Sequence, residues 1–218
     1  MMTGLAALLW TTSTWGLALR PPSVPIALTV APIAQLEDTT ELSLDAEAMR
    51  AEQHDATMRE WTRTLSAVTV AVFAAAGTLG ALQFHDEYGF HDEYADTACA
   101  RGDALLDHCG EQTPWAHLIA VGATAGLGLT TFVLSTQVDY DIAARHDADW
   151  RIYEVTRWVG LGMFVAQAIG GFLLANAERF GWADPQDDFD TMQAFAIAHL
   201  GLGAATLGVE VFNTLILF

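Results

Sequence analysis

Four long runs of apolar residues constrain this 218-residue chain more than any other feature of its sequence. A helix must present about 20 mainly apolar residues to cross the hydrocarbon layer of a bilayer. Four stretches meet this requirement, at about 64–84, 116–137, 155–176 and 191–218. The first and third contain no charged side chain between Leu65 and Phe84 or between Val159 and Ala177. We therefore predict an integral membrane protein whose immediate partner is the lipid bilayer.

Charge and cysteine content exclude several other classes of protein. The chain has 27 acidic and 9 basic residues, a formal net charge of -18, and 52% hydrophobic residues. Phosphate would repel so acidic a chain, so we expect no nucleic-acid partner. Disordered chains are poor in apolar residues, and two cysteines cannot build a disulfide-dense scaffold or a four-thiolate zinc site.

The connections between the apolar stretches favour one architecture. They are a polar loop of 31 residues at 85–115, a short one around 139–150 and one around 178–190. Short connections between consecutive spans favour an all-α, up-down-up-down four-helix bundle over residues 64–218. In such a bundle the second and fourth spans run in the same direction and lie diagonally across the core.

The N-terminal third divides into two segments. Residues 1–35 are apolar and rich in small side chains, which predicts a cleaved signal peptide or, alternatively, an uncleaved N-terminal anchor. Either would place the acidic segment 36–63 outside the cytoplasm, where its pattern predicts a short extramembrane amphipathic helix. The arginines contradict this orientation, because seven of the nine precede the first span or the uncharged part of the third, which starts at Trp158. The positive-inside rule would place those segments in the cytoplasm.

Two of the seven histidines, His117 and His199, lie in or at the edge of the apolar stretches. An imidazole inside a bilayer is costly without a partner, so an intramembrane histidine is a functional candidate. Both stand toward the N-terminal ends of parallel spans, at similar depth. Two such imidazoles with glycines nearby suit bis-histidine ligation of haem b, and Gly203 lies one turn beyond His199. Copper binding, a shared hydrogen bond and, for His117, an interfacial position are the alternatives.

This pattern resembles the cytochrome b561 superfamily of membrane haem proteins. The resemblance covers about residues 61–218 and rests on one histidine early in the second and fourth spans and on Gly201 and Gly203. It implies haem iron held by His117 and His199, with the two glycines in the cofactor site. Members typically carry a second bis-histidine haem on the other two core helices. The first and third spans here contain no histidine, which implies one haem b per chain.

The function that follows is electron transfer in a bacterial inner membrane, by a carrier or a subunit of an oxidoreductase complex. Its partners would be a quinol, a soluble cytochrome or other electron-transfer subunits. Glu210 shares the helix face of His199, about 16 Å further along the span, and with Gln167 is a candidate proton or quinone site. A protonated carboxyl bonded to a neighbour such as Gln167 is the structural alternative.

The loop before the second span supports two further hypotheses. It repeats Phe-His-Asp-Glu-Tyr at 84–88 and 90–94, which offers donors for a divalent metal but is also typical of a solvated acidic loop. Cys99 and Cys109 predict a structural disulfide if the loop is exported, and free thiols if it is cytoplasmic. Two other functions therefore remain open: a haem-free membrane scaffold or anchor, and a thiol-redox protein that uses the cysteine pair.

Overall fold

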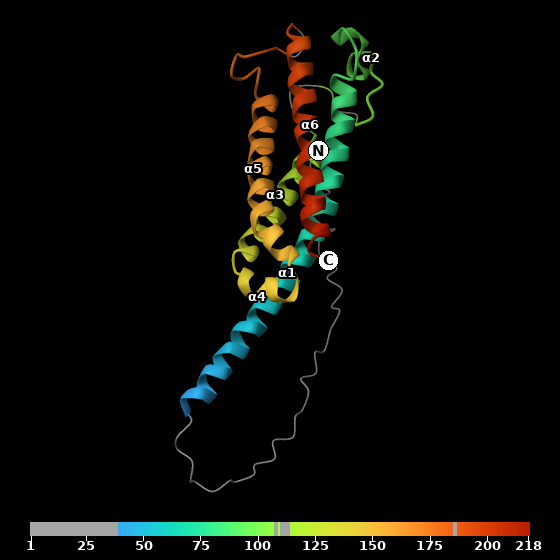
Figure 1. Ribbon diagram of the computed structural model, residues 1–218. Coiled ribbons are helices and arrows are strands. Elements are labelled where there is room, and N and C mark those ends of the chain that lie inside the picture. The colour runs from blue at the N-terminus through green and yellow to red at the C-terminus, as the bar shows by residue number, and fades with distance from the viewer. Residues whose placement is uncertain (1–38, 107–108, 110–113, 185–186) are drawn as a thin grey trace, which may run out of the picture. The chain divides into compact units, whose positions relative to one another are not determined.

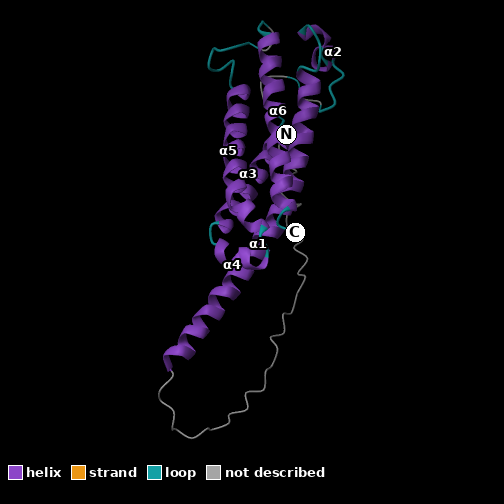
Figure 2. Cartoon of the chain, in the orientation of Figure 1, coloured by secondary structure: helices purple, strands orange, loops and turns teal. Residues whose placement is uncertain are grey.

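The structure is a computed structural model that describes residues 39–106, 109, 114–184 and 187–218, with side chains from residue 45 onward. The described residues form helices and loops and contain no strand (Figure 2). The elements are α1 (Thr39–Glu87), η1 (Tyr94–Asp96), α2 (Ala98–Arg101), α3 (Trp115–Ser135), α4 (Tyr140–His146), α5 (Asp149–Ala175) and α6 (Phe189–Leu215) (Figure 1). α1, α3, α5 and α6 are each long and apolar enough to cross a membrane. The predicted all-α, multi-pass character is thus confirmed, whereas the predicted signal or anchor at 1–35 lies outside the described residues.

α1 differs from the expectation of a separate extramembrane helix at 36–63. It runs unbroken for 49 residues, so the acidic segment and the first span form one helix. The physical reason is that residues 39–76 contain neither proline nor glycine, the residues that most readily end a helix. Of residues 45–60, only Asp55 is fully buried, and this part of α1 extends beyond the other long helices (Figure 1).

Hydrogen bonds define how α1 lies against α3. Near the start of α3, Nδ1 of His117 lies 3.2 Å from the carbonyl oxygen of Ala76. Near its end, the hydroxyls of Thr131 and Thr69 lie 3.3 Å apart. The partner in α1 therefore comes earlier in the chain as α3 proceeds, which shows that the two helices are antiparallel.

The remaining long helices are joined by equivalent contacts. His199 of α6 lies against Gly171 of α5, and Glu210, eleven residues later, lies against Gly160 of α5. α5 and α6 are thus also antiparallel. The hydroxyls of Ser66 and Thr214, 2.6 Å apart, connect α1 with α6.

Along the long helices, a residue on the inner face recurs every three or four positions, and many of these residues are polar. In α5 and α6 the inner positions are Trp150, Tyr153, Arg157, Gly160, Phe164, Gln167 and Gly171, and Met192, Ala196, His199, Gly203, Thr206, Glu210 and Asn213. This 3.5-residue spacing is that of left-handed helix packing. The outer faces carry large apolar side chains, such as Phe172 and Phe195, which are 59% and 61% exposed. Small and polar residues inside with apolar residues outside suit a bundle surrounded by lipid.

Aromatic clusters close the two ends of the helices. At one end, Phe84, Tyr88 and Phe189 pack with neighbouring apolar residues. At the other end, the cluster is built from Tyr140, Trp150 and Tyr153, together with Val138, Ala143 and Leu217. α4 belongs to this second cluster and was not expected from the sequence. It begins at the N-cap Asp139, whose carboxylate accepts hydrogen bonds from the N–H groups of residues 141 and 142.

Candidate functional site

His117 lies in the first turn of α3 and is half-buried against α1. Its Nδ1 lies 3.2 Å from the carbonyl oxygen of Ala76. A carbonyl only accepts, so Nδ1 carries the proton and the lone pair of the ring is on Nε2. Gly80 makes room for the ring, because a Cβ there would lie 3.0 Å from Cε1 of His117. This arrangement fixes both the tautomer and the position of the imidazole.

His199 lies in the third turn of α6, also half-buried, against α5. A Cβ on Gly171 would lie 3.0 Å from its Cε1, and one on Gly170 would lie 3.3 Å from its Nδ1. The side-chain amide nitrogen of Gln167 lies 3.1 Å from Nε2 of His199. Because an amide nitrogen donates, Nε2 accepts, and the ring proton lies on Nδ1. That Nδ1 is buried and has no hydrogen-bond partner among the described residues.

The structure places both histidines on inner faces, His117 against α1 and His199 against α5. The two predicted glycines differ in position. Gly203 shares the inner face of α6, since a Cβ there would lie 2.9 Å from Nε2 of Gln167. Gly201 is exposed, and a Cβ on it would meet nothing within 4 Å. Of the two, only Gly203 therefore adjoins the histidine region.

Glu210 lies at a different level of α6 from Gln167. It is half-buried where Gly160 leaves space, since a Cβ on Gly160 would collide with the Glu210 carboxylate. Asn213, one turn further along the same helix, lies beside the same glycine, since a Cβ on Gly160 would lie 3.2 Å from its Nδ2. Gln167 is instead beside His199 and Gly203. The structure thus separates two residues that the sequence grouped as one candidate site.

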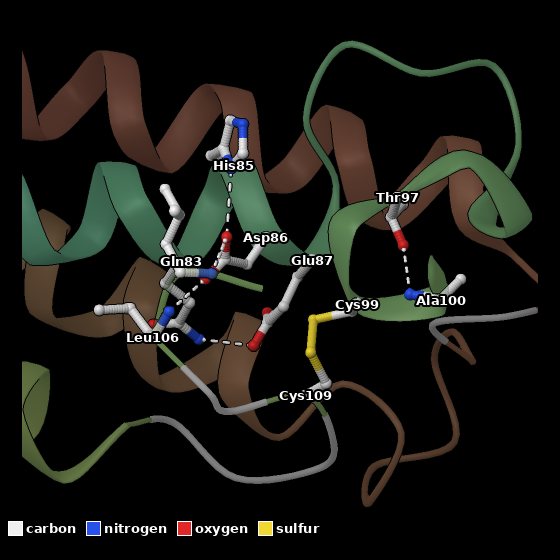
Figure 3. The surroundings of a disulfide bond; sticks show 10 residues. Gln83, His85, Asp86, Glu87, Thr97, Cys99, Ala100, Leu106 and Cys109 are labelled. Carbon is white, nitrogen blue, oxygen red and sulfur yellow. Dashed lines mark hydrogen bonds and ion pairs between the residues drawn. A yellow bond between two sulfur atoms is a disulfide. The ribbon is translucent and has the colours of Figure 1, made fainter. Parts of the chain in front are cut away.

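The loop after α1 contains a second set of polar contacts, shown in Figure 3. Cys99 and Cys109 form a disulfide, with their Cα atoms 5.3 Å apart. Asp86, which follows the apolar part of α1 and is fully buried, accepts hydrogen bonds from the backbone N–H groups of Leu105 and Leu106 at 3.0 and 2.8 Å. Asp86 therefore holds Leu105 and Leu106 against the end of α1, and the disulfide closes the stretch of loop that contains them.

The repeated Phe-His-Asp-Glu-Tyr sequence takes two different conformations. Its first copy completes α1, and its second follows Gly89, whose φ of 53° lies in the left-handed region that glycine favours. Gln193 of α6 donates hydrogen bonds to the carbonyl oxygens of Gly89 and His91 at 3.2 and 2.8 Å. In the part of the chain that the structure describes, no three His, Cys, Asp or Glu side chains gather in a group that could hold a metal.

Sequence reasoning missed the polar contacts at the opposite end of the bundle. Arg157 donates to the hydroxyl of Ser135 at 3.0 Å, and Asp55 accepts the backbone N–H of Asp139 at 2.8 Å. The signal that could have revealed them is the recurrence of polar and small residues along one face of each span. For α1 this face carries Asp55, Arg59, Thr62, Ser66, Thr69, Phe73, Ala76 and Gly80.

Comparisons with known proteins provide no assignment for this arrangement. No family model matches the chain, and neither a curated protein nor a solved structure matches it.

Proposed function

We propose that the four spans form an up-down-up-down bundle in a bacterial inner membrane and bind one haem b between His117 and His199. The protein would carry electrons between a quinol, a soluble cytochrome or another subunit of an electron-transfer complex. The observation that carries this proposal is the placement of two half-buried imidazoles on the inner faces of two spans, each beside glycines. Bis-imidazole ligation is typical of electron-transfer haems in helical bundles.

The residues around His117 suit an axial ligand. A metal-binding histidine usually donates its other ring N–H to a carbonyl or carboxylate, which fixes the ring and raises its basicity. The carbonyl of Ala76 has this role here, and Nε2 of His117 keeps its lone pair. Gly80 leaves the space beside the ring that a larger residue would fill.

The residues around His199 suit a second ligand of the haem iron, provided that one side chain changes its conformation. Its Nδ1 is a buried donor without an acceptor, and Gly170 and Gly171 keep the adjoining face of α5 open. Its Nε2 lone pair, however, accepts from the Gln167 amide. Gln167 must therefore turn away, or His199 must rotate, before Nε2 can bind iron.

Each part of the site would have a distinct task. Haem supplies one-electron redox chemistry when it is bound. His117 and His199 would hold it, the glycines would let it approach the helices closely, and the apolar outer faces would exclude water. Glu210, which lies beside Asn213 further along α6, would hold or accept a proton.

Histidine variants test this proposal through the absorption spectrum of the purified protein. His199→Ala and His117→Ala should each abolish the six-coordinate, low-spin haem spectrum, because each removes one axial ligand. His54→Ala is the matched control, since His54 is exposed on the projecting part of α1. An unchanged spectrum in His199→Ala would show that the haem is bound elsewhere.

A haem-free scaffold is the second candidate, and the direct contact between Gln167 and His199 favours it. In that function the two side chains would serve only to pair α5 with α6. The Gln167→Leu variant distinguishes the two functions. It should destabilise a scaffold by leaving His199 unpartnered, whereas a haem protein should retain its cofactor.

A further inference from the structure

Three arginines converge on the bundle at the end opposite the disulfide. Arg59 and Arg63 belong to α1, and Arg157 belongs to α5. Arg63 comes one residue before the first apolar stretch begins, and Arg157 directly precedes the uncharged segment that starts at Trp158. Both therefore lie at the level where a spanning helix leaves the hydrocarbon and enters the headgroup layer.

The three arginines differ in how their charge is balanced. Arg59 forms an ion pair with Asp55, with Nε and Oδ2 2.9 Å apart. Among the described residues, neither Arg63 nor Arg157 has a carboxylate within ion-pair distance. Their guanidinium groups lie over aromatic rings instead, Arg63 at 5.5 Å from Trp150 and Arg157 at 4.7 Å from Tyr140. Two half-buried positive charges thus remain without a counter-ion.

Hydrogen-bond donors in the same region are also unsatisfied. The buried Nε atoms of Arg63 and Arg157, the indole nitrogen of Trp150 and the hydroxyl of Thr62 have no partner in the described parts of the chain. Trp150 and Thr62 are both 0% exposed. Three of these four groups can only donate, and the hydroxyl can also do so. Buried donors normally find an acceptor, and none of the described residues provides one for this set.

Tyr140 does not supply the missing negative charge. Its hydroxyl donates to the carbonyl oxygen of Ser135 at 2.8 Å. Burial raises the pKa of Tyr140 to about 12, although Arg157 acts in the opposite direction. The phenol is therefore neutral at physiological pH, and Tyr140 does not balance the charge of either arginine.

We propose that Arg63 and Arg157 bind the phosphate of an anionic membrane lipid at this end of the bundle. The guanidinium group presents paired donors that match phosphate oxygens. Basic pockets between spanning helices bind anionic headgroups, and the depth of both arginines places them beside lipid phosphates. The acyl chains would lie along the exposed apolar outer faces. This site is separate from the histidine region and does not depend on the proposed haem.

The first test uses the wild-type full chain in nanodiscs of two compositions. One contains phosphatidylcholine alone, and the other contains phosphatidylcholine mixed with phosphatidylglycerol. We expect the protein to retain phosphatidylglycerol through detergent extraction, measured by native mass spectrometry, and to unfold at a higher temperature in the anionic nanodiscs. Equal retention and equal stability in both would overturn the proposal. Stabilisation by inorganic phosphate in phosphatidylcholine nanodiscs, equal to that by phosphatidylglycerol, would also overturn it by showing a free-anion site.

The second test assigns the lipid to these two arginines. We expect Arg63→Gln and Arg157→Gln each to lower the retention of phosphatidylglycerol relative to phosphatidylcholine by about fivefold. Arg151→Gln is the matched control, because Arg151 lies at the same end but is exposed and paired with Asp141 and Glu154. Retention by both variants equal to that of the control would contradict the assignment. If a Gln variant does not fold, the Lys variant at the same position is measured instead. It should retain less phosphatidylglycerol than the wild type, because an ammonium lacks the paired donors of a guanidinium. Retention equal to that of the wild type would contradict the assignment.

Discussion

Two adjacent glycines of α5, Gly170 and Gly171, let the ring of His199 on α6 lie directly against the backbone of α5. The ring lies against Gly170 and Gly171, whereas Gly162 on the same helix has open space at its Cβ position. A glycine in a helix costs stability relative to alanine, so close contact is a physical reason for using it. The position of His199 therefore depends on the absence of side chains on α5 as much as on its own helix.

Gly171→Ala tests this dependence. The new Cβ would lie 3.0 Å from Cε1 of His199 and 3.3 Å from its Nε2, so the ring must shift. Overpacking of this kind typically costs about 1 to 3 kcal/mol. We expect a lower melting temperature and less haem per chain, measured by differential scanning fluorimetry and haem assay. Gly162→Ala should lower neither quantity, because its Cβ would meet open space and alanine favours a helix over glycine. Equal behaviour of the two variants would contradict the close packing.

At the scale of helices, the sequence predicted the spans but not how the chain continues beyond them. Apolar length is a local property, so the cores of α1, α3, α5 and α6 were evident. The unbroken α1 and the short α4 were not. The absence of proline and glycine at 39–76 permits one long helix without requiring it, and the start of α4 depends on a distant partner. Asp55 shows this dependence, since it accepts the N–H of Asp139 at the start of α4, 84 residues away.

The candidate site was predictable to a similar extent. The cost of an imidazole in a bilayer singled out His117 and His199 from the sequence alone. Their partners depend on how each helix is rotated, which hydropathy does not specify. Gln167 could therefore be grouped with Glu210 from the sequence, although the structure places it beside His199.

Asp86 of α1 holds the following loop through hydrogen bonds whose strength depends on pH. Burial raises the pKa of the Asp86 carboxyl, but hydrogen bonds from Leu105, Leu106 and His85 outweigh it and hold the pKa below 3.8, its ordinary value. The charged form is therefore favoured in the folded loop. Its contribution to stability is complete above pH 3.8 and is lost as the pH falls through the lowered pKa.

Asp86→Asn should remove this contribution. We expect a loss of about 1 to 3 kcal/mol near neutral pH, because the carboxylate and its charge-assisted hydrogen bonds are replaced. Thermal unfolding should show a gap from wild type that is constant above pH 3.8 and narrows as the pH falls from 3.8 through the lowered pKa. Asp92→Asn, at an exposed position of the same loop, is the control. A gap that stays constant as the pH falls below 3.8 would contradict the ionic role of Asp86.

Across the whole molecule, two observations agree on the orientation in the membrane. Structural disulfides form in oxidising compartments, so the Cys99–Cys109 disulfide predicts that its loop lies outside the cytoplasm. Six of the eight arginines in the described residues lie at the opposite end, which the positive-inside rule would place in the cytoplasm. Both predict that the projecting part of α1 and α4 are cytoplasmic, contrary to the export that the apolar N-terminus indicates.

Single reporter cysteines test this orientation in intact cells. In a Cys99→Ser, Cys109→Ser background, Asp103→Cys should react with a membrane-impermeant maleimide from outside. Asp147→Cys, next to α4, should react only after lysis, and both positions are exposed or half-exposed in the structure. Labelling of Asp147→Cys alone in intact cells would show the reverse orientation.

The most direct test of the account is a dithionite-reduced minus air-oxidised absorption spectrum of the purified full chain, with a pyridine haemochrome assay. The paired imidazoles of His117 and His199 predict a sharp reduced α band and about one haem b per chain. A colourless protein from haem-replete cells would contradict this. His117 and His199 would then be packing residues, and the scaffold function would take precedence.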